Sequence, residues 1–187
     1  MNGWEGELVR LRAIEPRDVD AIGADSDTDT ARAGWRVFPP RSAWATGEWV
    51  RKTTEQSSDG DDFRVAIEAL ASGELVGNLN TYGCRPVDGT CSYGITLFSW
   101  AQRQGYGREA VVLVLRYLFG ERRYQKCTVG AYGFNDGSVA FHEALGFKIE
   151  GRIRRAHFAL GTYHDEIVLG ITTEEFEKLW GFGGPIG

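Results

Sequence analysis

The chain is poor in the residues that build metal centres and disulfide frameworks. Its 187 residues include only three cysteines and three histidines. The cysteines show no C-x-x-C spacing, so buried thiols in a reducing compartment are favoured over a disulfide or zinc framework. No pair of histidines has a standard ligand spacing, which argues against a metal site built from them.

Long apolar runs and an excess of positive charge are also absent. No apolar run approaches the roughly 20 residues that a membrane-spanning helix needs. The first residues show no basic segment followed by an apolar one, so no signal peptide is predicted and a cytoplasmic location is expected. The net charge of -5 argues against a nucleic-acid partner and suits a cationic acceptor such as an amine.

Composition and hydrophobic pattern predict one globular α/β domain over residues 1–187. The hydrophobic share of 42% is ordinary for such a domain. The elements follow the order βα(α)βββαβαββ, which predicts a mixed sheet with helices on both faces. We read residues 23–34 as a polar, acidic loop. The predicted strands are 8–13, 63–70, 75–82, 90–97, 126–130, 147–159 and 165–171, and the predicted helices are 15–22, 42–56, 107–119, 135–145 and a short last helix capped by Thr173.

A glycine loop between an apolar strand and an apolar helix is the most informative stretch of the sequence. The strand pattern of residues 90–97 stops at Ser99, and an apolar helix pattern follows Gly107. Gly105 lies in the loop between them. Such a layout points backbone N–H groups and the positive end of the helix dipole at one place, and glycine lets an anion approach. The stretch therefore predicts a site for a phosphate or pyrophosphate, with a plain strand-to-helix turn as the alternative.

Three nucleotide-binding patterns compete for this loop. A Walker A loop requires Gly-Lys-Ser/Thr, whereas Gly107 is followed by Arg108. A Rossmann fingerprint requires a third glycine where the chain has Ala110, and it belongs near the start of a βαβ unit. The pattern Gln/Arg-x-x-Gly-x-Gly/Ala does fit. It covers Gln102, Arg103, Gln104, Gly105, Tyr106 and Gly107.

A second motif, Asn-x-x-Ser-x-x-Phe-His-x-x-Leu-Gly-Phe, runs from Asn135 to Phe147. Taken alone, its asparagine has a structural explanation as a helix cap. Together with the glycine loop, the motif resembles the GNAT family, the Gcn5-related N-acetyltransferases. Residues 8–18 and 161–165 further resemble the branch of that family that contains the ribosomal-protein N-terminal acetyltransferases.

The resemblance implies a mostly antiparallel sheet that splays at a central parallel pair, here strands 90–98 and 124–130. Acetyl-coenzyme A would be the co-substrate, with its pantetheine arm between those strands and its pyrophosphate held by the glycine loop. A backbone N–H at Leu97 or Phe98 would polarise the thioester carbonyl, a contribution of about 2.7–4 kcal/mol. The cofactor-binding residues that the resemblance implies are Leu97, Phe98, Gln102, Arg103, Gln104, Gly105, Tyr106, Gly107, Arg108, Asn135 and Ser138.

The implied reaction transfers acetyl to an amine, which must lose a proton before it attacks. A lysine-like amine has a pKa of about 10.4 and an α-amine one of about 7.7–8.0. By resemblance, Ser138 serves the leaving thiolate, and His157 takes the place of a glutamate base, a role that neutral histidine can fill. His142 stands where many members carry a tyrosine acid, and Glu68 is a further candidate for a water-mediated base. Each of these side chains also has an ordinary structural role as its alternative.

The acceptor stays open at this point. A protein N-terminus, a polyamine and a small-molecule amine such as an antibiotic all fit, and the ribosomal-branch resemblance favours a peptide or protein amine. A homodimer would agree with the resemblance, because dimers are common in that family. The alternative from another class is a non-catalytic acyl-coenzyme A-binding or sensing module, which the missing tyrosine at His142 favours. An NAD-dependent enzyme is a third, weaker reading.

Overall fold

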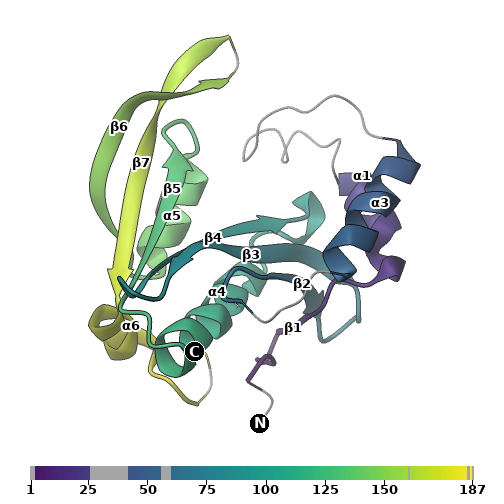
Figure 1. Cartoon of the computed structure of the whole chain (residues 1–187), viewed down its shortest axis with the longest axis horizontal. Helices are drawn as coiled ribbons and strands as arrows, with labels where there is room; N and C mark the ends of the chain where they lie inside the picture. Colours follow the sequence, from purple (N-terminus) through teal and green to yellow (C-terminus); the bar gives the residue numbers. More distant parts are fainter. Residues whose placement is uncertain (1–2, 26–41, 56–59, 160, 185, 187) are drawn as a thin grey trace. The chain divides into compact units, whose positions relative to one another are not determined.

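The computed structural model describes residues 3–25, 42–55, 60–159, 161–184 and 186. They form two compact units. Figure 1 shows the chain with colours that follow the sequence. The first comprises Met1–Tyr82, Gly94–Val114 and Pro185–Gly187, and the second comprises Gly83–Tyr93 and Leu115–Gly184. The predicted acidic loop lies outside the described residues from position 26 onward. The expectation of one domain over residues 1–187 stays a prediction.

The described strands form one mixed sheet in the order β1-β2-β3-β4-β5-β7-β6, which confirms the predicted fold class. Neighbouring strands are antiparallel in the pairs β1–β2, β2–β3, β5–β7 and β6–β7. Strands β4 and β5 are parallel, and their pairing joins Thr90 to Lys126 and Cys91 to Cys127. The strands are β1 (Val9–Arg12), β2 (Arg64–Ala69), β3 (Leu75–Arg85), β4 (Thr90–Leu97), β5 (Lys126–Tyr132), β6 (Lys148–Ala159) and β7 (Thr162–Thr172).

The helices of the first unit begin where the sequence signals them. A 3-10 turn at Pro16–Asp18, with proline in its first turn, leads into α1 (Val19–Asp25). Helix α3 (Ala43–Thr54) is capped by Ser42, whose hydroxyl accepts the N–H of Ala45 at 3.1 Å. A 3-10 turn at Ser99–Ala101 precedes α4 (Tyr106–Arg116), whose last two residues belong to the second unit.

In the second unit, the chain leaves α4 through a π-helical turn at Tyr117–Glu121, which extends the predicted helix. Helix α5 (Asp136–Ala144) begins after Asn135, as predicted. Helix α6 (Thr173–Trp180) is capped by Thr172 rather than by the predicted Thr173. The correction has a clear cause, because the Thr172 hydroxyl accepts the N–H of Glu175 while the Glu175 carboxylate accepts the N–H of Thr172.

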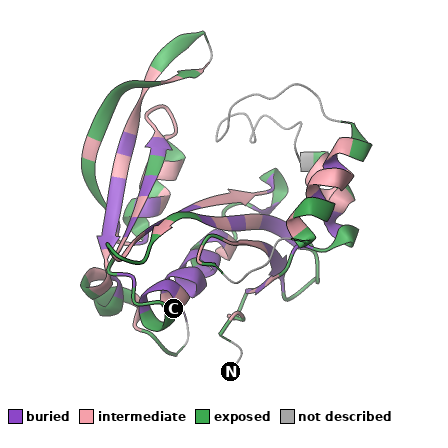
Figure 2. Cartoon of the chain, viewed as in Figure 1, coloured by how far each residue is buried: buried purple, intermediate pink, exposed green. Residues whose placement is uncertain are grey.

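Burial differs from strand to strand: it alternates along β5, whereas β6 is mostly exposed (Figure 2). In the second unit, Val129, Ala131, Ile167 and Leu169 are buried, and the residues between them on β5 and β7 are less so. All three cysteines are free thiols, and two of them, Cys91 and Cys127, are buried. Within the described residues, no helix is long and apolar enough to cross a membrane.

Candidate functional site

The glycine loop of the first unit has an unusual backbone. Arg103 has a φ of 60° and Gly105 a φ of 86°, so both lie in the left-handed region. That conformation costs a residue other than glycine about 1–2 kcal/mol, so the arginine is held there by its surroundings. The amide of Gln104 supports the loop by donating to the carbonyl of Trp100 at 2.9 Å. Gln102, Arg103 and Gln104 are exposed.

Helix α4 begins directly after this loop. Its hydrogen bonding starts with the N–H of Glu109, which donates to the carbonyl of Gly105 at 3.1 Å. The amides of Tyr106 and Gly107 lie ahead of that bond, in the turn where an α-helix has no carbonyls of its own to offer. Together with the positive end of the helix dipole, this turn is suited to a phosphate group.

Glu109 fixes the start of α4 to the start of β1, a contact that the sequence analysis missed. Its buried carboxylate accepts the backbone N–H groups of Glu7, Leu8 and Val9 at 2.8, 2.8 and 2.6 Å. A Cβ atom at Gly6 would lie 2.3 Å from the Glu109 carboxyl carbon, so only glycine fits beside this carboxylate. A glutamate in the first turn of a helix is common, and the sequence therefore gave no special signal.

The two residues predicted to polarise the thioester are Leu97, the last residue of β4, and Phe98, which follows it. The N–H of Phe98 donates to the carbonyl of Val76 at 2.9 Å, and the phenyl ring is buried. Because that amide already has an acceptor, the amide of Leu97 is the better placed of the two for an oxyanion role. The Leu97 carbonyl accepts a hydrogen bond from the Gln102 side chain at 3.4 Å, which ties the strand to the loop.

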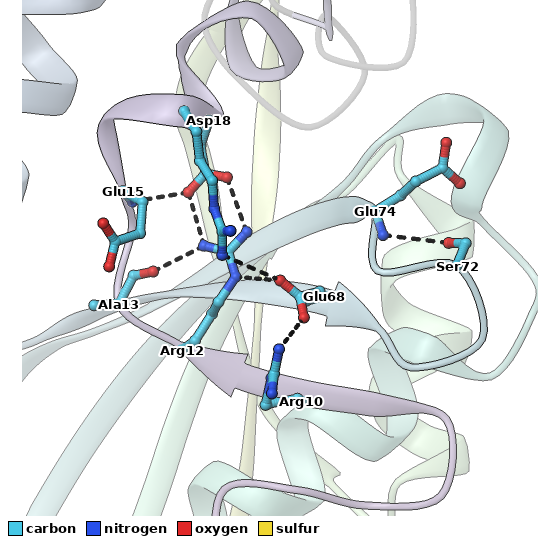
Figure 3. A network of polar contacts seen from close by, with 9 residues as sticks. Arg10, Arg12, Ala13, Glu15, Asp18, Glu68, Ser72 and Glu74 are labelled. Carbon is cyan, nitrogen blue, oxygen red and sulfur yellow. Dashed lines mark hydrogen bonds and ion pairs between the residues drawn. The ribbon is translucent and has the colours of Figure 1, made fainter.

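Glu68 lies on β2 in a network of ion pairs, shown in Figure 3. Its buried carboxylate contacts the guanidinium groups of Arg10 and Arg12, and Arg12 also makes a bidentate pair with Asp18 at 2.8 and 2.9 Å. Burial alone would raise the pKa of Glu68, but the hydrogen bonds from the two arginines lower it. A carboxylate held in its ionised form by two cations is a weak base, so this environment favours a structural role for Glu68.

In the second unit, α5 brings together three residues of the second motif. The side-chain oxygen of Asn135 accepts the N–H of Ser138 at 3.0 Å and so caps the helix. The Ser138 carbonyl lies 2.7 Å from Nδ1 of His142. A carbonyl only accepts, so Nδ1 carries the hydrogen of this imidazole.

His142 is a buried side chain surrounded by aromatic rings. The ring centroids of Tyr93 and Phe147 lie 5.7 and 5.4 Å from that of His142. Burial lowers the pKa of His142, and the Ser138 carbonyl opposes this only in part. The imidazole is therefore neutral at pH 7, and it packs where the sequence pattern would have allowed a tyrosine.

His157 lies on β6 and is half-buried. Its Nε2 atom is 3.3 Å from a carboxylate oxygen of Glu166 on β7, and the ring of Tyr132 packs edge-on against it at a centroid distance of 4.5 Å. His157 was predicted from the sequence as a site residue, whereas Glu166 was not. Its one signal is its position on the strand that returns from the hairpin.

The comparisons with known proteins settle the family. Residues 9–148 match the family model described as Acetyltransferase (GNAT) domain. The chain is 38% identical over 175 residues to the SPbeta prophage-derived N-acetyltransferase YokL of Bacillus subtilis strain 168, itself uncharacterized. That match covers 93% of this chain and 95% of YokL. This chain therefore belongs to the GNAT acetyltransferase family, and it is an N-acetyltransferase that uses acetyl-coenzyme A as its co-substrate.

Solved structures share the fold at lower identity. A GCN5-related N-acetyltransferase from Brucella melitensis aligns with a TM-score of 0.78 and 23% identity, over 92% of this chain and 79% of that one. The spermidine N-acetyltransferase from Vibrio cholerae, solved with CoA and spermine, aligns with a TM-score of 0.77 and 21% identity, over 90% of this chain and 97% of that one. Among the described residues, no group of three or more His, Cys, Asp or Glu side chains could hold a metal ion.

Proposed function

We propose that this enzyme acetylates a primary amine by direct attack on acetyl-coenzyme A, with the pyrophosphate held by the loop that precedes α4. The observation that carries the proposal is the strained loop itself, in which Arg103 and Gly105 adopt left-handed angles just ahead of the open turn of the helix. Arg103 and Arg108 would add charge-assisted contacts to the phosphates.

In the proposed reaction, the neutral amine attacks the thioester carbonyl carbon, a C–N bond forms and the C–S bond breaks. His157 takes the proton that the acceptor ammonium must lose, and the leaving thiolate takes a proton with the help of the Ser138 hydroxyl. The amide of Leu97 polarises the carbonyl. His142 and Glu68 have structural roles in this proposal. The His142 imidazole is buried and neutral, and the Glu68 carboxylate is paired with two arginines.

The acceptor is the part of the function that needs an experiment. The net charge of -5 suits a cationic amine. One Bacillus subtilis relative, YdaF, is 23% identical over 175 residues and is named provisionally as a ribosomal N-acetyltransferase. The spermidine N-acetyltransferase that shares the fold points to polyamines instead. We propose a peptide or protein amine first, with polyamines and small-molecule amines as competing acceptors.

The test is to incubate the purified chain with acetyl-coenzyme A and a panel of peptides, polyamines and aminoglycosides while following free thiol. Thiol release that depends on one class of amine supports the proposal and names the acceptor. Tight binding of coenzyme A without thiol release on any amine would favour a non-catalytic sensing module. Light scattering of the same sample tests the proposed homodimer, and cell fractionation tests the proposed cytoplasmic location.

A further inference from the structure

The open face of the sheet in the second unit carries a histidine and a carboxylate in contact. Val129, Ala131 and Ile167 face the core, so the residues between them on β5 and β7 face the other way. Gly130 and Glu166 therefore lie on the open face. His157 joins them from β6, where it is paired with His164.

The contacts hold Glu166 in one place. Its carboxylate lies over Gly130, where an added Cβ atom would come within 1.9 Å of the oxygen Oε1. Its other oxygen, Oε2, is 3.3 Å from Nε2 of His157. The ring of Tyr132 packs edge-on against the imidazole. A glycine on β5 thus makes room for a carboxylate from β7, and that carboxylate meets the imidazole from β6.

A β-bulge brings His157 to this position. Ile153 pairs with Glu166, but His157 pairs with His164, so three residues of β6 stand opposite Asp165. Without the bulge, regular pairing after Ile153 would place Arg155 opposite His164. The partner of His157 on β7 would then lie two residues further from Glu166.

Asp165 stabilises the bulge. Its carboxylate accepts the N–H of Arg155 at 2.9 Å and a guanidinium N–H of Arg152 at 3.2 Å. Arg155 itself has a φ of 54°, a conformation that such an anchor must hold in place.

We propose that Glu166 is a positioning residue that acts through His157, an inference that rests on the proposed role of His157 as the base. Because a carboxylate oxygen of Glu166 lies 3.3 Å from Nε2, the hydrogen of the neutral imidazole belongs on Nε2 and the lone pair on Nδ1. Nδ1 takes one proton from the acceptor ammonium, and the imidazolium stays paired with the carboxylate until that proton passes to water. His157 is about one quarter exposed, with a side-chain exposure of 24%, so water can reach it.

Two side chains on neighbouring strands contact the His157 ring: the carboxylate of Glu166 on β7 and the ring of Tyr132 on β5. His164 is the cross-strand partner of His157. Removal of the Glu166 carboxylate should leave the tautomer and the orientation of the imidazole unfixed.

The experiment compares Glu166→Gln with the wild-type enzyme over a pH range, using the best amine of the panel. We expect kcat to fall about 10- to 100-fold with little change in the KM for acetyl-coenzyme A. Glu166→Asp should recover part of the rate. Glu150→Gln is the matched control, because Glu150 pairs with Lys126 at 2.6 Å and is similarly exposed, and it should leave kcat unchanged.

A double-variant cycle decides whether Glu166 acts through His157. In a His157→Gln background, Glu166→Gln should cause no further loss. An equal loss in both backgrounds would overturn the inference, as would a wild-type kcat in Glu166→Gln. A loss of kcat in Glu166→Gln that exceeds the loss in His157→Gln would make Glu166 the base itself, which also overturns the inference.

A measurement without substrate separates this inference from the proposed function. The ring nitrogen resonances of His157, assigned by their loss in His157→Gln, should show the hydrogen on Nε2 in the wild type and a mixture of both tautomers in Glu166→Gln. Gly130→Ala should give the same mixture, since the new methyl group would lie 1.9 Å from Oε1 of Glu166 and displace the carboxylate. If no amine is acetylated but the tautomer changes in the variants, the pairing stands and the proposed function fails. If amines are acetylated but the tautomer is unchanged in both variants, the function stands and the inference fails.

Discussion

Glu109 shows how much one buried carboxylate contributes to the stability of this fold. It is 2% exposed and accepts three consecutive backbone N–H groups from the residues that lead into β1. Hydrogen bonds to a charged acceptor are worth more than neutral ones, and a buried donor left without an acceptor costs about 1–3 kcal/mol.

Replacing this carboxylate by an amide should therefore destabilise the fold. We expect Glu109→Gln to lower the free energy of unfolding by about 2–3 kcal/mol, because the amide NH₂ group faces N–H donors. Urea unfolding measures the change. The control is Glu7→Gln, at an exposed position in the same segment, which should unfold at the wild-type midpoint. Equal midpoints for both variants would contradict the role assigned to Glu109.

His142 makes a second residue-scale prediction, about pH. Because its pKa is lowered in the folded chain, the unfolded chain binds a proton first as the pH drops below about 6.5. The free energy of unfolding should therefore be fully present above that value and fall between pH 7 and pH 5. In His142→Phe, which keeps a ring among Tyr93 and Phe147, urea midpoints at pH 7 and pH 5 should differ less than in the wild type. An identical difference in both proteins would show that other groups govern this pH range.

Asp18 should affect the free energy of unfolding at lower pH than His142 does. Burial would raise the pKa of its carboxyl, but hydrogen bonds from Arg12 and from the Glu15 amide lower it. A carboxyl with a lowered pKa stabilises the fold above its unfolded value of about 3.9, and this stabilisation is lost as the pH falls further. Asp18→Asn should therefore show a flatter loss of stability below pH 4 than the wild type, measured by thermal unfolding at successive pH values.

At the scale of elements, the loop before α4 depends on glycine at one position. Gly105 has a φ of 86°, and an added Cβ atom would lie 2.9 Å from a methyl group of Leu8. Gly105→Ala therefore strains the loop by about 1–2 kcal/mol or shifts its amides.

If those amides hold the pyrophosphate, Gly105→Ala should weaken coenzyme A binding about 10-fold or more in calorimetry. Gly73→Ala is the matched control. It imposes the same kind of backbone strain, at a φ of 69° in the β2–β3 hairpin, with open space around the new methyl group. It should cost stability and leave the affinity unchanged. Wild-type affinity in Gly105→Ala would remove this loop from the cofactor site.

For the whole molecule, the co-substrate should stabilise the folded state by mass action. Coenzyme A at 100 times its Kd adds about 2.7 kcal/mol, which for a chain of this length corresponds to a rise in Tm of about 5–10 °C. Thermal unfolding with coenzyme A, with adenosine and with NAD tests this directly. A rise with coenzyme A alone is expected, whereas a rise with NAD alone would revive the NAD-dependent reading.

Most elements could be predicted because their signals are local. Ser42 caps α3, Asn135 caps α5, and the turn at Pro16 starts where the proline stands. Alternating apolar residues gave the strands within a few positions. The misplaced cap at Thr172 and the π-helical turn after Arg116 are shifts of a few residues, decided by hydrogen bonds that propensity does not encode.

The partners of the candidate site residues were not predictable in the same way. The sequence allowed Glu68 to be a water-mediated base, but in the fold β1 pairs it with Arg10 and Arg12. Arg12 in turn pairs with Asp18 of the 3-10 turn before α1. Glu109 and Glu166 gave little signal in the sequence, because their partners lie far along the chain. Glu109 contacts the start of β1, and Glu166 contacts β5 and β6.

The sequence by itself determined the family, the order of the elements and the place of the glycine loop, because these depend on residues that are neighbours in the chain. The tertiary structure decided which ionisable groups are buried, paired or open to water. A side chain's charge state depends on the dielectric and the partners around it, and strands that meet in a sheet can supply those partners from any distance along the chain.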